Sequence, residues 1–285
     1  ETRRALTAKA DGPAALRLAL HGGAVVLLGG LIAAGVPGWA LIMLPQGILL
    51  VILFTAMHEC LHRTAFATPR ANDLVAAGLG FLLLLPPDWF RLFHFAHHRH
   101  TQDPLRDPEL AAAKPETWPA FLRHLTGLPL WASLVRTVLT NAAGRNADPF
   151  VPAAARPGLA REARAMLAGY AALAALSAAA GSAALLWAWV VPALAGQPVL
   201  RLYLLAEHGR CPQVADMFAN SRTTFTARAV RWLAWNMPYH AEHHAMPAVP
   251  FHRLPELHAL ARAELKTTER GYARFALSYA ASLGR

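Results

Sequence analysis

Two long windows without a charged side chain constrain the fold more than any other feature of this sequence. No Asp, Glu, Lys or Arg occurs in residues 18–57 or in residues 165–200, which are 40 and 36 residues long. Because an α-helix rises about 1.5 Å per residue and the hydrocarbon core of a bilayer is about 30 Å thick, each window can cross a membrane twice. We therefore expect two helical hairpins embedded in a bilayer.

The composition agrees with a membrane protein, since 55% of the residues are hydrophobic and only 15% are charged, against about a quarter charged in soluble domains. The expected fold is an all-α integral membrane protein with four transmembrane helices in two hairpins and a cytoplasmic helical cap. We treat residues 1–285 as one domain. The expected spans are about 14–36, 39–58, 164–181 and 183–206, with the cap formed by residues 59–163 and 207–285.

A shorter apolar stretch lies inside the expected cap. Residues 74–85 are apolar but too few to span a bilayer, and Pro86 and Pro87 end the stretch. We expect a re-entrant or interfacial helix at this position.

The basic residues indicate the orientation of the chain. All 27 Lys and Arg side chains fall outside the two windows, and cytoplasmic segments carry the excess of such residues. Both termini and the cap are therefore expected to face the cytoplasm. The net charge of +10 is then a topology signal and an attraction to anionic lipid rather than a nucleic-acid footprint. Arg outnumbers Lys 24 to 3, which is typical of a GC-rich bacterial genome, so we expect the bacterial inner membrane.

Histidine is the residue type that indicates chemistry. Fourteen histidines include one HxxxH pattern, at His58 and His62, and two HxxHH patterns, at residues 94–98 and 240–244. Spacings of three and four place imidazoles on one helical face, about 5 to 6 Å apart, close enough to share metal ions. Two cysteines without a CxxC pair exclude a cysteine-based zinc or rubredoxin-type site.

The expected topology brings the histidines together. His58 and His62 end the second span, His208 ends the fourth, and both HxxHH boxes lie in segments assigned to the same side. Nine imidazoles exceed what one zinc ion takes, whereas imidazole also suits iron, so the set favours two irons of higher coordination number. Two irons beside a lipid-accessible cavity indicate O2 activation and attack on an unactivated C–H bond.

The order of these boxes, followed by Pro247 and by the segment PFHRLPELH at residues 250–258, resembles the integral-membrane fatty acid desaturase and hydroxylase superfamily. Glu207-His208-Gly209 and the NMPYH segment at 236–240 are also similar to membrane alkane hydroxylases, and a carotenoid substrate stays open. The resemblance implies a four-span fold, a cytoplasmic di-iron site and O2 as co-substrate. The ligands that it implies are His58, His62, His94, His97, His98, His208, His240, His243 and His244.

The resemblance also implies partners. These are a hydrophobic or amphiphilic substrate and an external ferredoxin-, rubredoxin- or cytochrome-type electron donor with its reductase, because two spans occupy the residues before His58 and the third box occupies the C-terminal segment. Carboxylates and amides near the boxes are candidates to accept ring N–H groups and orient the ligands. They are Glu59, Asp103, Asp107, Glu207, Asn236 and Glu242.

Several functions remain open at this point. Desaturation and hydroxylation share the first hydrogen abstraction, so the sequence leaves hydroxylation as an alternative to desaturation. Residues 58–62 also satisfy HExxH, the pattern of zinc metalloproteases in which the Glu is the general base, but this leaves both HxxHH boxes unexplained. A metal transporter would need ionisable groups inside the spans, where the two windows hold only His21.

Overall fold

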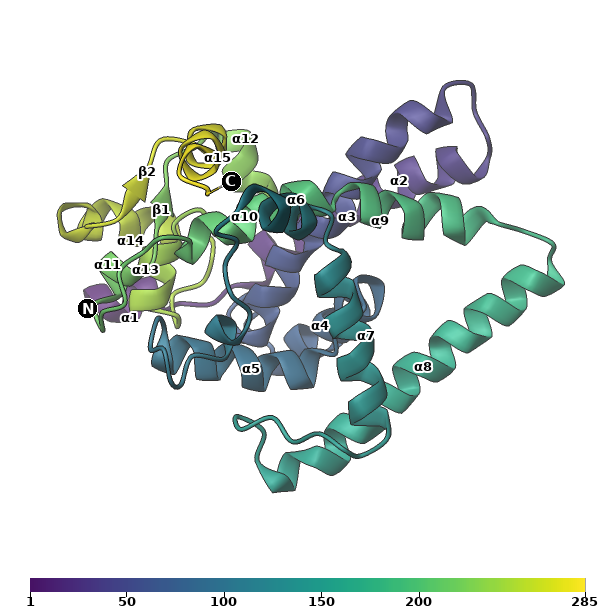
Figure 1. Cartoon of the computed structure of the whole chain (residues 1–285), viewed down its shortest axis with the longest axis horizontal. Coiled ribbons are helices and arrows are strands. Elements are labelled where there is room, and N and C mark those ends of the chain that lie inside the picture. Colours follow the sequence, from purple (N-terminus) through teal and green to yellow (C-terminus); the bar gives the residue numbers. More distant parts are fainter. Residues whose placement is uncertain (285) are drawn as a thin grey trace.

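The computed structural model describes residues 1–284, and these fold almost entirely into helices (Figure 1). The elements are α1 (Thr2–Leu6), α2 (Asp11–Ala33), α3 (Trp39–Leu61), α4 (Pro69–Leu83), α5 (Pro87–His100), η1 (Pro108–Ala111), α6 (Trp118–Leu125), α7 (Leu128–Ala142), η2 (Ala153–Ala155), α8 (Arg156–Ala179), η3 (Leu186–Val190), α9 (Val191–Ala195), α10 (Gln197–His208), α11 (Met217–Asn220), β1 (Thr223–Thr224), α12 (Arg228–Leu233), α13 (His240–Ala245), α14 (Leu254–Ala261), η4 (Arg262–Glu264), β2 (Thr268–Glu269) and α15 (Tyr272–Ala281). The two short strands pair in parallel.

Three helical stretches are long and apolar enough to cross a membrane, namely Thr2–Ala33, Trp39–Leu61 and Leu186–His208. A fourth candidate is the pair α4 and α5, which bends by 99° at its break and forms a broken span or a re-entrant loop. The prediction of an all-α membrane fold is confirmed. Exposed leucines and valines on α2 fit contact with lipid, since their side chains would otherwise face water.

The third predicted span differs from the other three, because the structure does not identify it as a candidate span. Residues 164–181 lie largely in α8, a single helix, but this helix is not among the candidate spans of residues 1–284. Arg161, Glu162 and Arg164 lie within its first three turns. Figure 1 shows α8 leaving the body of the molecule and returning through η3 and α9. Its passage through a bilayer therefore stays a prediction.

The corner between α4 and α5 turns the chain under α3. Leu84 adopts the left-handed conformation with φ of 58°, and Pro87 starts α5. A Cβ added at Gly80 would lie 2.5 Å from the carbonyl oxygen of Leu85 and 2.7 Å from Cδ of Pro87, so only glycine admits this close approach. The corner sets the direction of α5, which carries the second histidine box.

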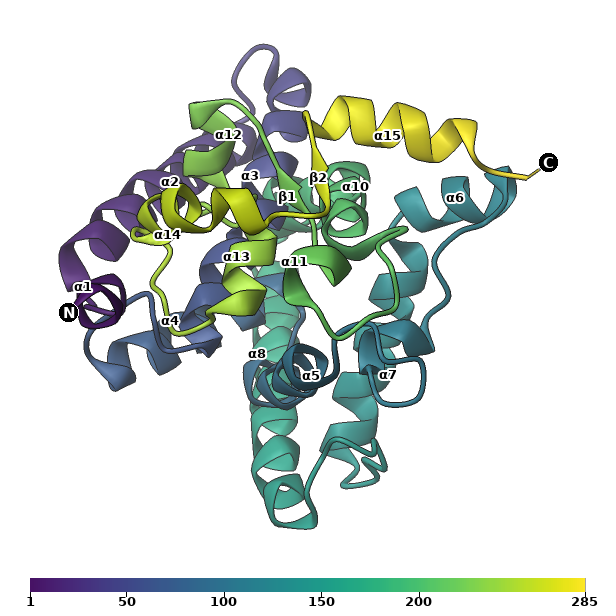
Figure 2. The same cartoon turned by 90° about the vertical axis from the view of Figure 1, so that its left-hand side faces the viewer.

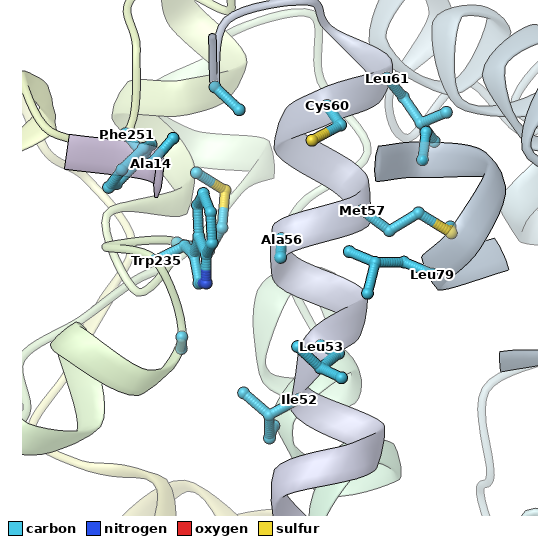
Figure 3. Close-up of a cluster of buried hydrophobic side chains, with 14 of the residues drawn as sticks. Ala14, Ile52, Leu53, Ala56, Met57, Cys60, Leu61, Leu79, Trp235 and Phe251 are labelled. Atoms are coloured by element: carbon cyan, nitrogen blue, oxygen red, sulfur yellow. The ribbon is translucent and has the colours of Figure 1, made fainter. Parts of the chain in front are cut away.

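The hydrophobic core fixes the C-terminal segment against α3. In Figure 3, Trp235 and Phe251 face Ala56 of α3 from one side, and Leu79 of α4 packs against Met57 on the other. Both aromatic side chains are fully buried, with ring centroids 4.6 Å apart. Figure 2 shows α13 and α14 in front of α3. This packing holds the third histidine box beside the first.

Candidate metal centre

Four helices bring the histidine boxes to one place. The first box forms the end of α3, the second lies on the last three turns of α5, His208 ends α10, and the third box forms α13. Helical spacing of three and four residues aligns the rings of each box on one face. The convergence that the sequence predicted is present in the fold.

Eight of the nine histidines form two clusters, within each of which the possible ligand atoms all lie within 4.8 Å of one another. The larger group is called the first cluster, and the smaller is called the second cluster. The first cluster is His58, His62, His94, His98 and His243, and the second cluster is His97, His208 and His244.

The distances between ring nitrogens within the clusters match those between metal ligands. In the first cluster, Nε2 of His62 and Nε2 of His98 lie 2.8 and 2.9 Å from Nε2 of His94. In the second cluster, Nε2 of His97 and Nε2 of His208 are 3.1 Å apart. With metal–nitrogen bonds of about 2.1 Å, adjacent ligands are about 3.0 Å apart in an octahedron and about 3.4 Å apart in a tetrahedron. The rings of each cluster are therefore close enough to bind one ion together.

His240 is the ninth histidine and lies beside the second cluster. Its Nε2 is 2.9 Å from Nε2 of His208, and its Nδ1 is 3.4 Å from Oε1 of Glu207. It is therefore placed to join the second cluster around a shared ion.

Buried nitrogens without a protein partner test whether a metal fits. Both ring nitrogens of His58 and His243 are buried without a hydrogen-bond partner, as is Nε2 of His244. Each buried polar atom without a partner lowers the stability of the fold by about 1–3 kcal/mol. A site with several such nitrogens is therefore expected to bind a further group that accepts their lone pairs. A metal ion supplies that interaction, and the donor set fits one.

Hydrogen bonds outside the second cluster fix which nitrogen faces inward. Nδ1 of His97 donates to Oδ1 of Asp107 at 2.9 Å, and both side chains are buried. Asp107 is itself held by the backbone N–H of Gln102 at 2.8 Å. Because the proton of His97 lies on Nδ1, its Nε2 lone pair is free for a metal.

The other two members of the second cluster are fixed in the same way. The Thr101 hydroxyl donates to the carbonyl of His97 at 2.8 Å, so toward Nδ1 of His244, at 3.2 Å, it acts as the acceptor. Nδ1 of His208 donates to the carbonyl of Asn220 at 3.1 Å. All three rings thus present an unprotonated Nε2 to the same point.

Burial also keeps the histidines of α13 neutral. Desolvation, followed by the electrostatic influence of neighbouring imidazoles, lowers the pKa of His240, His243 and His244 well below its ordinary value. A neutral imidazole is the form that binds a metal. At neutral pH these three rings therefore need no deprotonation before they bind an ion.

A cavity of about 1690 Å³ opens from the histidines into apolar surroundings. His58, His94, His97 and His208 form part of its wall. Leu50, Phe54, Leu200 and Leu204 line it along α3 and α10, and it continues past α5, α6 and α7. The clusters therefore open onto a space whose wall along α3 and α10 is largely aliphatic and aromatic, and which also borders charged side chains such as Glu109, Lys114 and Arg201.

The sequence matches the fatty acid desaturase family model over residues 15–276. The chain belongs to the fatty acid desaturase family. This confirms the resemblance found in the sequence, and the match spans all three histidine boxes. None of the curated proteins matches the sequence. Family membership, apolar spans and the histidine clusters together make the protein a membrane enzyme with a histidine metal site.

Six residues were predicted to orient ligands in this desaturase-family site. Two of them, Asp107 and Glu207, lie next to histidines of the predicted ligand set. Asp107 accepts from His97, as described above. The Glu207 carboxylate is 3.4 Å from His240, which is longer than a normal hydrogen bond. Asp107 therefore has the position that the prediction requires, and Glu207 has an electrostatic contact only.

Glu59 and Asn236 serve the tail segment instead. Oε1 of Glu59 accepts from the backbone N–H of Phe251 at 2.9 Å, and the Asn236 amide donates to the carbonyl of the same residue at 2.9 Å. The Glu59 bond holds the third-box tail against α3, and the Asn236 bond joins the segments before and after α13. Neither bond orients an imidazole of the clusters. Because the carboxylate of Glu59 is fully buried against this backbone, it also lacks the position of a metalloprotease general base.

Asp103 and Glu242 likewise bind other groups. Asp103 pairs with Arg106 in a surface turn. Glu242 is fully buried and contacts the Thr223 hydroxyl and Nδ1 of His258. The expectation that these two carboxylates orient ligands is corrected by these contacts, because adjacency in sequence to a box does not decide which way a side chain points.

Glu109 is a residue that the sequence reasoning missed. Its Oε2 lies 3.4 Å from Nε2 of His97, on the metal-facing side of that ring, and its other oxygen pairs with Lys114. Burial alone would raise its pKa, but the Lys114 ammonium, with His97 and His208, outweighs burial and holds the pKa below its usual range. The available signal was its position two residues after Asp107.

Proposed function

We propose that the protein is an O2-dependent di-iron oxidoreductase that desaturates a lipid-like or amphiphilic substrate. The observation that carries the proposal is the opening of two histidine clusters onto one apolar cavity. Family membership makes an oxidative reaction on a lipid the first expectation. Hydroxylation of the same kind of substrate remains the second candidate, because both reactions begin with removal of one hydrogen.

The proposed ligands are nine histidines, namely the eight of the three boxes and His208. The first cluster offers five imidazoles, and the second offers three with His240 beside it. Imidazole alone suits zinc, copper, nickel and iron, and nine imidazoles exceed the four ligands that a structural zinc site takes. Two iron ions held there would supply the activation of O2 and the removal of hydrogen from an unactivated C–H bond.

The chain's own part in this proposal is positioning and exclusion of water. Asp107, Thr101 and the carbonyl of Asn220 hold three ring protons on the outer nitrogens. The aliphatic wall from α3 and α10 binds a hydrocarbon chain and keeps water away from the reacting carbon. A substrate seated in the cavity would reach the histidines without leaving apolar surroundings.

An external donor completes the proposed reaction. Desaturation with one O2 forms two waters and a C=C bond, and it consumes two electrons and two protons in addition to the two hydrogens of the substrate. We assign the electrons to a ferredoxin-, rubredoxin- or cytochrome-type partner with its reductase. The bacterial inner membrane, with the metal site facing the cytoplasm, is the proposed location, supported by the positions of Lys and Arg.

Metal content and product mass test the proposal together. Purified protein in nanodiscs is expected to hold about two irons per chain, one for each cluster. With O2, a reductase system and candidate lipids, the product is expected to lose two hydrogens, whereas gain of one oxygen would establish hydroxylation. One zinc with peptidase activity would contradict both reactions.

A further inference from the structure

Arg201 is a cation within an apolar candidate span, and among residues 1–284 no carboxylate lies within ion-pair distance of it, although Glu109 acts on it electrostatically. The stretch Leu186–His208 contains only two charged side chains, Arg201 and Glu207. Arg201 lines the large cavity. No carboxylate of residues 1–284 forms an ion pair with it, and its Nε is buried without a hydrogen-bond partner. A charge placed at such cost is expected to have a function.

His124 of α6 adds a second donor at the same place. Nη2 of Arg201 lies 3.3 Å from Nδ1 of His124. Because a guanidinium can only donate, Nδ1 is the acceptor and the ring proton lies on Nε2. That Nε2 is also buried without a partner. Burial, then the neighbouring Arg201, lowers the pKa of His124 to about 4, so the ring is neutral at pH 7.

The surrounding groups do not supply the missing acceptor. Glu109 is the nearby carboxylate, and it is paired with Lys114. Gln197, one turn before Arg201 on α10, donates from its Nε2 to the carbonyl of Ala193 and leaves its own Oε1 buried without a partner. Arg201 and His124 both line the cavity, and each has a buried N–H group without an acceptor, which is the arrangement expected beside a bound anion.

We propose that Arg201 and His124 bind the anionic headgroup, a carboxylate or a phosphate, of a single-chain amphiphile in the cavity. Arg matches the planar oxygens of such groups through its fork of donors, and the Nε2–H of His124 adds a third hydrogen bond. The hydrocarbon chain then lies along the aliphatic wall of α3 and α10. Neutral substrates such as alkanes and carotenoids lack the group that this site recognises.

The separation of Arg201 and His208 along α10 determines which part of a bound hydrocarbon chain lies at the second cluster. Arg201 precedes His208 by seven residues, which is two helical turns on the same face, or about 10 Å. A headgroup held at Arg201 therefore places the chain at a fixed distance from the second cluster. Resting on the proposed function, this predicts that the oxidised carbon is counted from the headgroup and not from the methyl end.

Binding can be measured without turnover. Wild-type protein in nanodiscs, with empty nanodiscs as the blank, is expected to bind dodecanoate or dodecyl phosphate at least about tenfold more tightly than dodecanol, as one charge-assisted interaction allows. The two anions distinguish a carboxylate from a phosphate headgroup. Arg201→Met should remove this preference while leaving dodecanol binding unchanged, which also shows that the cavity is intact.

Further variants keep the test decisive if Arg201→Met does not fold. Arg201→Lys retains the charge without the fork and should keep part of the preference, and His124→Phe should reduce it. Arg161→Met removes an exposed cation of α8 outside the cavity and should change nothing. Equal binding of dodecanol and both anions by the wild type, or an undiminished preference in Arg201→Met, would overturn the proposal.

The position of oxidation is a separate readout. With fatty acids of increasing length, the modified carbon is expected to stay at a constant number of carbons from the carboxylate. A constant number from the methyl end would contradict positioning by the headgroup. If no oxidation occurs but the binding preference is present, the proposed function fails and the headgroup site stands. If oxidation occurs without the preference, the headgroup site alone fails.

Discussion

Single residues decide how ready the site is to take a metal. The second cluster has a complete outer layer of acceptors, namely Asp107, Thr101 and the Asn220 carbonyl. In the first cluster, Nδ1 atoms of His58, His98 and His243 have no such acceptor. The second cluster is therefore the more rigid of the two, because its tautomers are fixed before a metal arrives.

Asp107→Asn tests this difference. An amide accepts less strongly than a carboxylate from Nδ1 of His97, so metal affinity is expected to fall about 10- to 100-fold. Iron retained after dialysis against graded chelator measures the loss, which should affect about half of the bound metal. Asp103→Asn, in the surface turn, is the matched control. Equal retention by both variants would contradict the role given to Asp107.

The two clusters can also be emptied separately. His243→Ala removes a member of the first cluster and His97→Ala a member of the second, and each is expected to abolish turnover while the protein still inserts into membranes. Iron per chain and product formation are the measurements. His252→Ala alters a histidine outside both clusters and should leave iron content unchanged. Full activity in both cluster variants would refute a shared di-iron site.

At the scale of elements, the α4–α5 corner positions the second box. Gly80 and Gly78 lie on the same helix, but a Cβ meets backbone and proline atoms at Gly80 and nothing within 4 Å at Gly78. The corner can be opened by one methyl group, because backbone atoms of a turn cannot move aside as a flexible side chain does.

Gly80→Ala is expected to destabilise the protein by about 1–3 kcal/mol through overpacking, and to lower iron occupancy by shifting α5. Gly78→Ala should be neutral or stabilising by up to about 1 kcal/mol, since alanine favours the helix. Thermal unfolding and iron content of the two variants provide the comparison. Equal melting temperatures would show that α5 is not set by this corner.

The sequence predicted elements and boxes better than their mutual contacts. Charge-free windows and the histidine spacing are local patterns, so the apolar helices at 14–36 and 39–58, the stretch at 74–85 and the histidine clusters were readable directly. The hydrogen-bond acceptors that orient the imidazoles could not be read from the sequence in this way. Whether Glu59 faces an imidazole or the Phe251 amide depends on packing between segments 192 residues apart, and the pairing of Arg201 with His124 likewise joins distant helices.

At the scale of the whole molecule, the metal centre joins segments that are remote in sequence. Its histidines come from α3, α5, α10 and α13, so bound ions would act as cross-links between these four helices. An ion that binds only the folded state stabilises it by about 2.7 kcal/mol at a free concentration 100 times its Kd. The apo protein should accordingly be less stable than the holo protein.

Metal removal is the corresponding experiment. Chelated protein is expected to melt several degrees below the iron-loaded protein, and addition of Fe²⁺ should restore the melting temperature. Mg²⁺ serves as the control ion, because it prefers oxygen ligands and should restore nothing. Identical melting curves before and after chelation would show that the metal does not link the four helices.

The wide separation of the boxes also has a consequence for biosynthesis. His98, the last histidine of the second box, and His240 are 142 residues apart, and at about 5–20 residues per second a ribosome needs about 7 to 28 s to add that length. During this interval the nascent chain already exposes imidazoles of the first two boxes while the third does not yet exist. A metal ion shared among all the boxes can therefore bind only after translation has passed α13, and until then the site lacks the ligands of its third box.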